Sequence, residues 1–194
     1  MRFAHDQRLH HRALSPRCIR VHEPGAHPQR IKIGHWASAE RAMDRDGRNA
    51  DLSSHLSVLV REDAGPYLAL EAHTDPHADG VALDVFALGA IAFLLFTGQP
   101  PAASDLDLQD RLARGQGLRV SDALNGAGQA LQDLIQYATH PDPTARLASV
   151  AEFLEYLDLV EEELTRPDNQ RLRGCEKTSG QMRNELAFVM LTKR

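Results

Sequence analysis

The most continuous hydrophobic stretch of the chain is found at residues 83–97, where nearly every side chain is apolar. A helix that is apolar on all sides is buried on all sides, so this stretch predicts a central core helix. Gly98 is a helix stop signal, and Pro100 and Pro101 just beyond it cannot continue a helix. The strictly apolar run, residues 85–96, is too short to predict a membrane span.

Weaker hydrophobic patterns predict the remaining regular elements. Apolar residues recur every three or four positions, the spacing of amphipathic helices, in residues 105–114, 130–139 and 148–164. Ser149, with Glu152 three positions later, is the expected N-cap of the last helix. Short apolar or alternating segments at 18–21 and 30–33 predict two strands joined by a turn-rich connection.

The other segments set the domain organisation. Residues 1–10 are expected to end a helix, and residues 38–66 are polar and weakly periodic, which is typical of a loop. Beyond residue 165 the chain is polar and interrupted by Pro and Gly, and an apolar candidate strand returns only at 188–191. We predict one mainly helical (α+β) domain over residues 1–165. A linker or tail, or the start of a following domain, is predicted over 166–194.

Composition and charge narrow the classes of function. With 42% hydrophobic and 25% charged residues, the chain is typical of soluble globular proteins. Its net charge of −5 gives no electrostatic basis for binding nucleic acid or an anionic membrane. Cys18 and Cys175 lie far apart, so no disulfide framework is expected. The N-terminus has no apolar stretch typical of a signal peptide, and we expect a cytoplasmic protein.

A catalytic motif with altered chemistry lies near the N-terminus. Residues 11–18 read His-Arg-Ala-Leu-Ser-Pro-Arg-Cys and resemble the protein-kinase catalytic loop, His-Arg-Asp-Leu-x-x-x-Asn. In kinases the Asp accepts the proton of the substrate hydroxyl and the Asn holds a magnesium ion. Ala13 stands at the Asp position of this chain, and Cys18 stands at the Asn position.

Further kinase landmarks follow in the family order. Residues 31–37 resemble the hairpin that leads into the Asp-Phe-Gly motif, with His35 at the metal-binding Asp and Trp36 at the Phe. Three later segments resemble the end of the activation segment, the opening of the central buried helix, and a turn that supplies an arginine. They are residues 66–71, 84–89 and 140–146.

Together these landmarks make residues 1 to about 160 similar to the C-lobe of a bacterial Ser/Thr protein kinase. The resemblance implies the helical C-lobe of the protein-kinase-like fold with a small β-hairpin. The glycine-rich loop and the lysine strand of the N-lobe would precede His11, which has only ten residues before it. We therefore expect the N-lobe to be missing.

The resemblance also implies that structural residues of the fold are kept. Asp84 would accept hydrogen bonds from the loop backbone near His11 and Arg12, and Trp36 would stack beside His11. Arg12 would further engage a phosphorylated or acidic residue in the 38–66 loop. A second implied contact is the buried ion pair that holds the end of the activation segment. Its two members are Glu71 and Arg146.

The positions that carry kinase chemistry are changed. Ala13 has no group that accepts a proton. Magnesium prefers oxygen ligands, whereas Cys18 offers soft sulfur and His35 a neutral or cationic ring. We expect no intact catalytic, cofactor-binding or metal-binding residue, with ATP and magnesium bound only if another chain completes an active domain.

Three functions remain open from the sequence. The first is a pseudokinase-like module for protein interaction or regulation, whose partner is a protein such as an active kinase or a separate N-lobe. The second is a Ser/Thr kinase that such an N-lobe completes, and the third is a nonfunctional gene fragment. No nucleic-acid or membrane partner is expected.

Other candidate sites rank lower. His73 and His77 have the spacing of metal ligands on a helix, but Pro76 between them argues against a helix, and solvated loop histidines are the preferred interpretation. Cys18 near a histidine suggests a thiol nucleophile, although a partly buried structural cysteine is favoured. Ser15 lacks the glycine-flanked setting of a hydrolase nucleophile.

Overall fold

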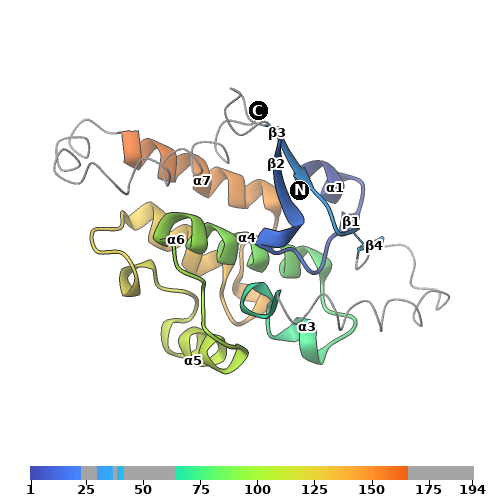
Figure 1. The fold of residues 1–194 in the computed structure, drawn as a ribbon, viewed down its shortest axis with the longest axis horizontal. Coiled ribbons are helices and arrows are strands. Elements are labelled where there is room, and N and C mark those ends of the chain that lie inside the picture. The colour runs from blue at the N-terminus through green and yellow to red at the C-terminus, as the bar shows by residue number, and fades with distance from the viewer. Residues whose placement is uncertain (23–29, 37–38, 42–63, 166–194) are drawn as a thin grey trace.

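The computed structural model describes residues 1–22, 30–36, 39–41 and 64–165. Helices surround the central helix α4 (Gly80–Thr97), and a hairpin of β2 (Ile19–His22) and β3 (Arg30–Ile33) lies at one side of the bundle (Figure 1). The mainly helical fold with a small β-hairpin that the sequence predicts is confirmed. Residues 166–194, the predicted linker or tail, lie outside the described part, so that boundary stays a prediction.

Helix α4 begins three residues before the hydrophobic pattern does, because Asp79 caps it. The Asp79 carboxylate accepts a hydrogen bond from the Val81 amide at 3.2 Å. At the other end Gly98 takes the left-handed conformation, with φ of 71°, as the sequence predicts for the stop signal. The helix is apolar and long enough to cross a membrane, with mean hydropathy of 2.2, yet 72% of it is buried inside the protein, as in a core helix.

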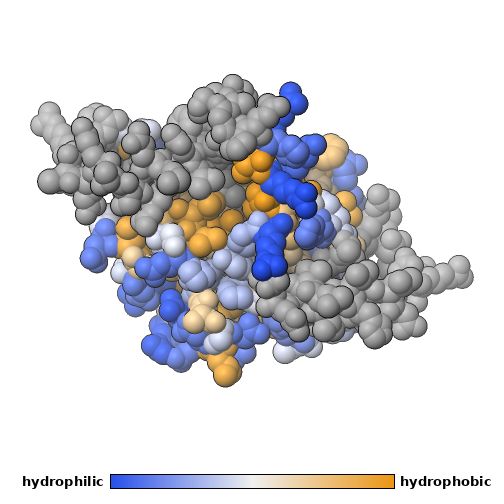
Figure 2. Space-filling model, viewed as in Figure 1, coloured by the Kyte–Doolittle hydropathy of each residue, from blue (hydrophilic) through white to orange (hydrophobic). Residues whose placement is uncertain are grey.

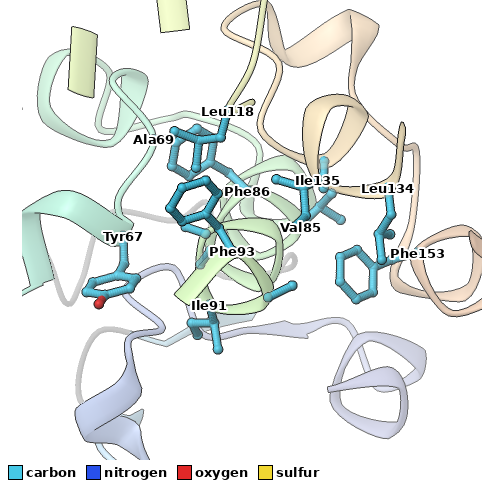
Figure 3. Packing of buried hydrophobic residues seen from close by; sticks show 14 of the residues in the cluster. Tyr67, Ala69, Val85, Phe86, Ile91, Phe93, Leu118, Leu134, Ile135 and Phe153 are labelled. Atoms are coloured by element: carbon cyan, nitrogen blue, oxygen red, sulfur yellow. The ribbon is translucent and has the colours of Figure 1, made fainter. Parts of the chain in front are cut away.

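The core forms where α4 meets the helices that follow it. Val85 lies beside Ile135 of α6 (Gln129–Ala138), and Phe86 points toward Ala69 and Leu118 (Figure 3). Phe153 of α7 (Val150–Thr165) packs into the same cluster. Burying each such side chain contributes about 1.5–3 kcal/mol to folding. Gly89 permits the close approach of α4 and α6, because a Cβ there would lie 2.7 Å from the Ala138 Cβ.

Capping fixes the later helices close to their predicted positions. Ser104 caps α5 (Asp105–Gly115) by accepting from the Asp107 amide. The Ser149 hydroxyl accepts from the Glu152 amide at 3.1 Å, which confirms the predicted N-cap of α7. Glu163 in the last turn of α7 accepts hydrogen bonds from the first backbone amides of α6, so a side chain of α7 caps the N-terminus of α6.

The two predicted strands form an antiparallel pair with alternating burial. Ile19 pairs with Ile33 and Val21 with Ile31, and these four side chains face the protein. A second, shorter pair joins β1 (Leu9–His10) to β4 (Glu40–Arg41). The connection predicted between β2 and β3, most of the 38–66 loop and the strand at 188–191 fall outside the described residues.

The N-terminal prediction was only partly right. Residues 1–10 contain the short helix α1 (Arg2–Asp6), but the chain then turns and enters β1. Arg8 makes this turn with a positive φ of 57°, which no hydrophobic pattern marks. Other short elements could not be predicted from hydrophobic periodicity either. They are α3 (Glu71–Thr74) and the 3₁₀ helices Pro16–Cys18, Gly65–Tyr67, Val120–Asp122 and Pro143–Ala145.

Candidate functional site

The loop that resembles a kinase catalytic loop is anchored to the fully buried carboxylate of Asp84 in α4. The backbone amides of His11 and Arg12 each donate to one Asp84 oxygen at 2.7 Å. The two contacts are charge-assisted hydrogen bonds, which are shorter and stronger than neutral ones. A buried charge that is not hydrogen-bonded would be strongly unfavourable, so this bonding fixes both the carboxylate and the loop.

A third contact to Asp84 comes from a residue that the motif does not contain. Nε2 of His5, in α1, lies 2.9 Å from Asp84 Oδ2, and the His5 ring lies 5.0 Å from that of His10. Burial, together with the neighbouring His5, lowers the pKa of His10. His5 could not be predicted, because nothing in the sequence distinguishes it from the other histidines of the chain.

Arg12 is held in an uncommon backbone conformation. Its φ of 64° lies in the left-handed region, which persists in a non-glycine residue only when surrounding contacts enforce it. The guanidinium donates to the carbonyls of Ala78 at 3.0 Å and Pro76 at 2.9 Å. The acidic or phosphorylated partner predicted for Arg12 falls in a loop that is mostly outside the described residues, so that role stays a prediction.

His11 and Trp36 lie side by side beneath the loop. Their ring centroids are 4.8 Å apart with planes tilted by 58°. The His11 ring is fully buried and has its Nε2 3.0 Å from the Gly34 carbonyl, while the Trp36 indole donates to the Ile33 carbonyl at 2.8 Å. The structure thus brings together the two rings that the resemblance places next to each other.

Cys18 is packed under the same loop rather than presented to solvent. Its side chain is 2% exposed, and its sulfur lies 3.5 Å from the Ser15 hydroxyl. Burial favours the neutral thiol, but hydrogen bonds from His11 and Ser15 outweigh it and lower the pKa of Cys18. A nucleophilic cysteine must be accessible to its substrate as well as have a low pKa, so the burial of Cys18 argues against the thiol-nucleophile alternative.

The pKa of His11 moves in the opposite direction. Burial disfavours the charged ring, but hydrogen bonds to Cys18 and to the Gly34 carbonyl raise the pKa of His11 above its ordinary value. A raised histidine pKa and a lowered cysteine pKa both favour an imidazolium–thiolate pair. Neither the His11 ring nor the Cys18 sulfur offers an oxygen ligand to a metal ion.

The three altered positions together present no carboxylate. The Ala13 side chain is buried, and Cys18 lies beneath the loop. His35 is exposed and has a φ of 61°, again in the left-handed region. Within the described residues, no group of three His, Cys, Asp or Glu side chains is placed to hold a metal ion. His73 lies in α3, which ends before His77, so the two rings do not share a helix face.

The Glu71 carboxylate and the Arg146 guanidinium meet in a two-point ion pair. Nη1 donates to Oε1, and Nη2 donates to Oε2 at 3.0 Å. Arg146 is 6% exposed, and its remaining donors reach the carbonyls of His140, Pro141 and Ala82. Its guanidinium also lies 5.1 Å from the centre of the Phe86 ring. Every donor of this buried cation is therefore used, which is the condition for burying it.

A broad hollow of about 800 Å³ lies elsewhere, between the end of α5 and the face of α6. Its lining is polar, but two of the amide side chains that line it are bonded to the protein backbone. Gln132 accepts from the Val120 amide at 2.9 Å, and Gln136 donates to the Gly115 carbonyl at 2.9 Å. No residue of the anchored loop lines this hollow.

Comparison with known proteins gives relatives for most of the chain, although no protein-family model matches it. It is 38% identical over 185 residues to the probable kinase PglW of Streptomyces coelicolor, covering 86% of the chain and 12% of PglW. It is 29% identical over 155 residues to the serine/threonine-protein kinase PknJ of Mycobacterium tuberculosis and to that of Mycobacterium bovis. These alignments cover 78% of the chain and 25% of each PknJ, so the chain spans a quarter or less of its curated relatives.

Proposed function

We propose, from a relationship to protein kinases that covers most of the chain, that this protein is a pseudokinase-like C-lobe module for protein interaction or regulation. The single observation that carries the proposal is the residue content of three positions, two in the loop that Asp84 anchors and one just after β3. Ala13, Cys18 and His35 occupy the sites of the proton acceptor and the two metal ligands that the kinase resemblance implies.

The loss of chemistry at these positions is expected to be severe. Loss of a general base alone reduces rates by about 10²–10⁴. Phosphate transfer further depends on metal ions that neutralise the developing charge, and neither the sulfur of Cys18 nor the ring of His35 is a suitable magnesium ligand. We therefore propose that the chain functions without ATP or magnesium.

The preserved contacts support a role for the folded surface. Asp84 still fixes the loop backbone, and Arg146 still fixes Glu71, although neither contact serves catalysis directly. The proposed partner is a protein, such as an active kinase or a separate N-lobe, and the proposed location is cytoplasmic. A net charge of −5 supports neither a nucleic-acid nor a membrane partner.

Phosphate transfer by the purified full chain tests the proposal. The chain is incubated with radiolabelled ATP, magnesium or manganese, and casein as an acceptor, beside the matched variant Asp84→Asn. We expect incorporation no higher than in the variant, and no saturable thermal shift with ATP. Transfer that Asp84→Asn or Arg12→Ala abolishes would overturn the proposal.

The second candidate is a Ser/Thr kinase that a separate N-lobe completes, and the activity named for the relatives favours it. Adding a purified kinase N-lobe to the same assay separates the two candidates, because only the second predicts ATP-dependent transfer on addition. A nonfunctional fragment predicts neither transfer nor a stable fold. Limited proteolysis distinguishes it, since the module predicts a protected core that ends near Leu164.

A further inference from the structure

The outward face of the β2–β3 hairpin is entirely basic. Side chains alternate between the two faces of a strand, and the exposed positions are Arg20 and His22 on β2 and Arg30 and Lys32 on β3. The strand register sets Arg20 opposite Lys32 and His22 opposite Arg30. Figure 2 shows deep-blue, strongly hydrophilic side chains where Figure 1 places this hairpin.

The pairing of Arg20 with Lys32 is unfavourable for the isolated hairpin, because like charges directly opposite each other on a sheet repel. Within the described residues, no carboxylate forms an ion pair with Arg20, Arg30 or Lys32. Other arginines of the chain are paired with acidic side chains. These are Arg111, Arg114 and Arg146. The hairpin therefore concentrates positive charge that the rest of the described fold does not compensate.

The charge of the remaining molecule limits what this face can bind. The whole chain carries −5, and α7 contains six acidic residues and no Lys or Arg. A long polyanion such as nucleic acid would meet repulsion beyond the hairpin, since its affinity comes from many phosphate contacts. A short anionic segment would contact only the basic face.

We propose that the Arg20–His22–Arg30–Lys32 face binds a short acidic segment of a protein partner. Basic residues two apart in one strand are separated by about 6.4–6.8 Å, which is also the spacing of alternate side chains in an extended peptide. An extended segment with carboxylates at alternate positions therefore matches the face. The inference goes beyond the proposed function, because this binding requires neither an active nor an inactive catalytic loop.

Fluorescence anisotropy with the full chain tests the inference. The probe is a labelled decapeptide that alternates Glu with Thr, titrated at about 10 mM and about 150 mM salt, where screening differs most. The double variant Arg20→Gln/Lys32→Gln removes one cross-strand pair. The control Arg114→Gln/Arg119→Gln removes the same charge near the end of α5, at the opposite side of the molecule in Figure 1. Both variants are checked for an unchanged melting temperature.

We expect binding that weakens with salt and that falls by about five- to tenfold in the hairpin variant, as for two lost exposed ion pairs, but not in the control. Three results would overturn the inference. These are no binding at low salt, equal loss in both variants, or tighter binding of a single-stranded oligonucleotide than of the peptide. Salt-sensitive self-association that the hairpin variant abolishes would also overturn it, by identifying a second copy as the occupant.

Discussion

The loop at residues 11–18 and the segment just after β3 together hold two groups of residues with contrasting surroundings. The anchoring group, formed by Asp84 with the backbone of His11 and Arg12, is buried and its polar groups are bonded. The positions where kinases carry their chemistry hold Ala13, Cys18 and His35, which present no oxygen ligand. One group holds the backbone and the other would meet substrate and metal, so the two can change independently.

The same contrast extends to the ion pair of Glu71 and Arg146. This pair joins the segment after Gly65–Tyr67 to the turn before α7. The partners of the Arg146 guanidinium are all groups of the protein itself, namely the Glu71 carboxylate and backbone carbonyls. The comparison teaches that the frame of this domain is stabilised by buried charges whose partners are structural. Of the altered positions, the buried Ala13 and Cys18 pack into the core, and only His35 is exposed.

Removing the guanidinium of Arg146 should have the largest effect on stability. Arg146→Met leaves the Glu71 carboxylate and several carbonyls without donors, and such breaks of buried pairs cost about 3–5 kcal/mol. Urea unfolding of variant and wild type measures the loss. Arg111→Met, which breaks an exposed pair with Asp107, is the control and should cost less than about 1 kcal/mol. Equal losses in the two variants would refute the distinction.

Neutralising Asp84 should have the next largest effect. Asp84→Asn keeps the shape but exchanges one acceptor for a donor, which then faces the amide of His11 or Arg12. Lost hydrogen bonds to a charged group cost about 1.5–3 kcal/mol each, so we expect about 2–3 kcal/mol in urea unfolding. A loss no larger than that of Asp122→Asn, at an exposed acid, would contradict the anchoring role.

The raised pKa of His11 predicts a pH-dependent contribution to stability. A raised folded-state pKa gives stability that is fully present below the ordinary value of about 6.5 and is lost as pH rises through the raised value. His11→Asn should therefore reduce the free energy of unfolding by more at pH 5.5 than at pH 8.5. His77→Asn is the exposed control. A penalty that grows with pH would contradict the prediction.

Substitution at a chemical position should have the smallest effect. His35 is exposed with a positive φ, and Asp tolerates that conformation. His35→Asp is expected to change the free energy of unfolding by less than about 0.5 kcal/mol. A change as large as that of Asp84→Asn would show that His35 contributes to the stability of the frame.

The sequence predicted the parts of the molecule that carry long patterns or motifs. The buried helix α4 and the amphipathic helices α5, α6 and α7 follow from hydrophobic spacing, and family motifs pointed to Asp84 and Arg146. Short elements could not be predicted this way, because α3 and the turn at Arg8 are shorter than a hydrophobic period and depend on local dihedral angles. His5 reaches Asp84 across 79 residues, and no local pattern encodes such a contact.

Hydrogen exchange at the His11 and Arg12 amides tests the central claim most directly, namely that a buried carboxylate holds this loop without the residues of phosphate transfer. The account predicts strong protection of both amides in the wild-type chain without nucleotide or metal, and its loss in Asp84→Asn. Rapid exchange of both amides in the wild-type chain, or protection that appears only after ATP and magnesium are added, would contradict it.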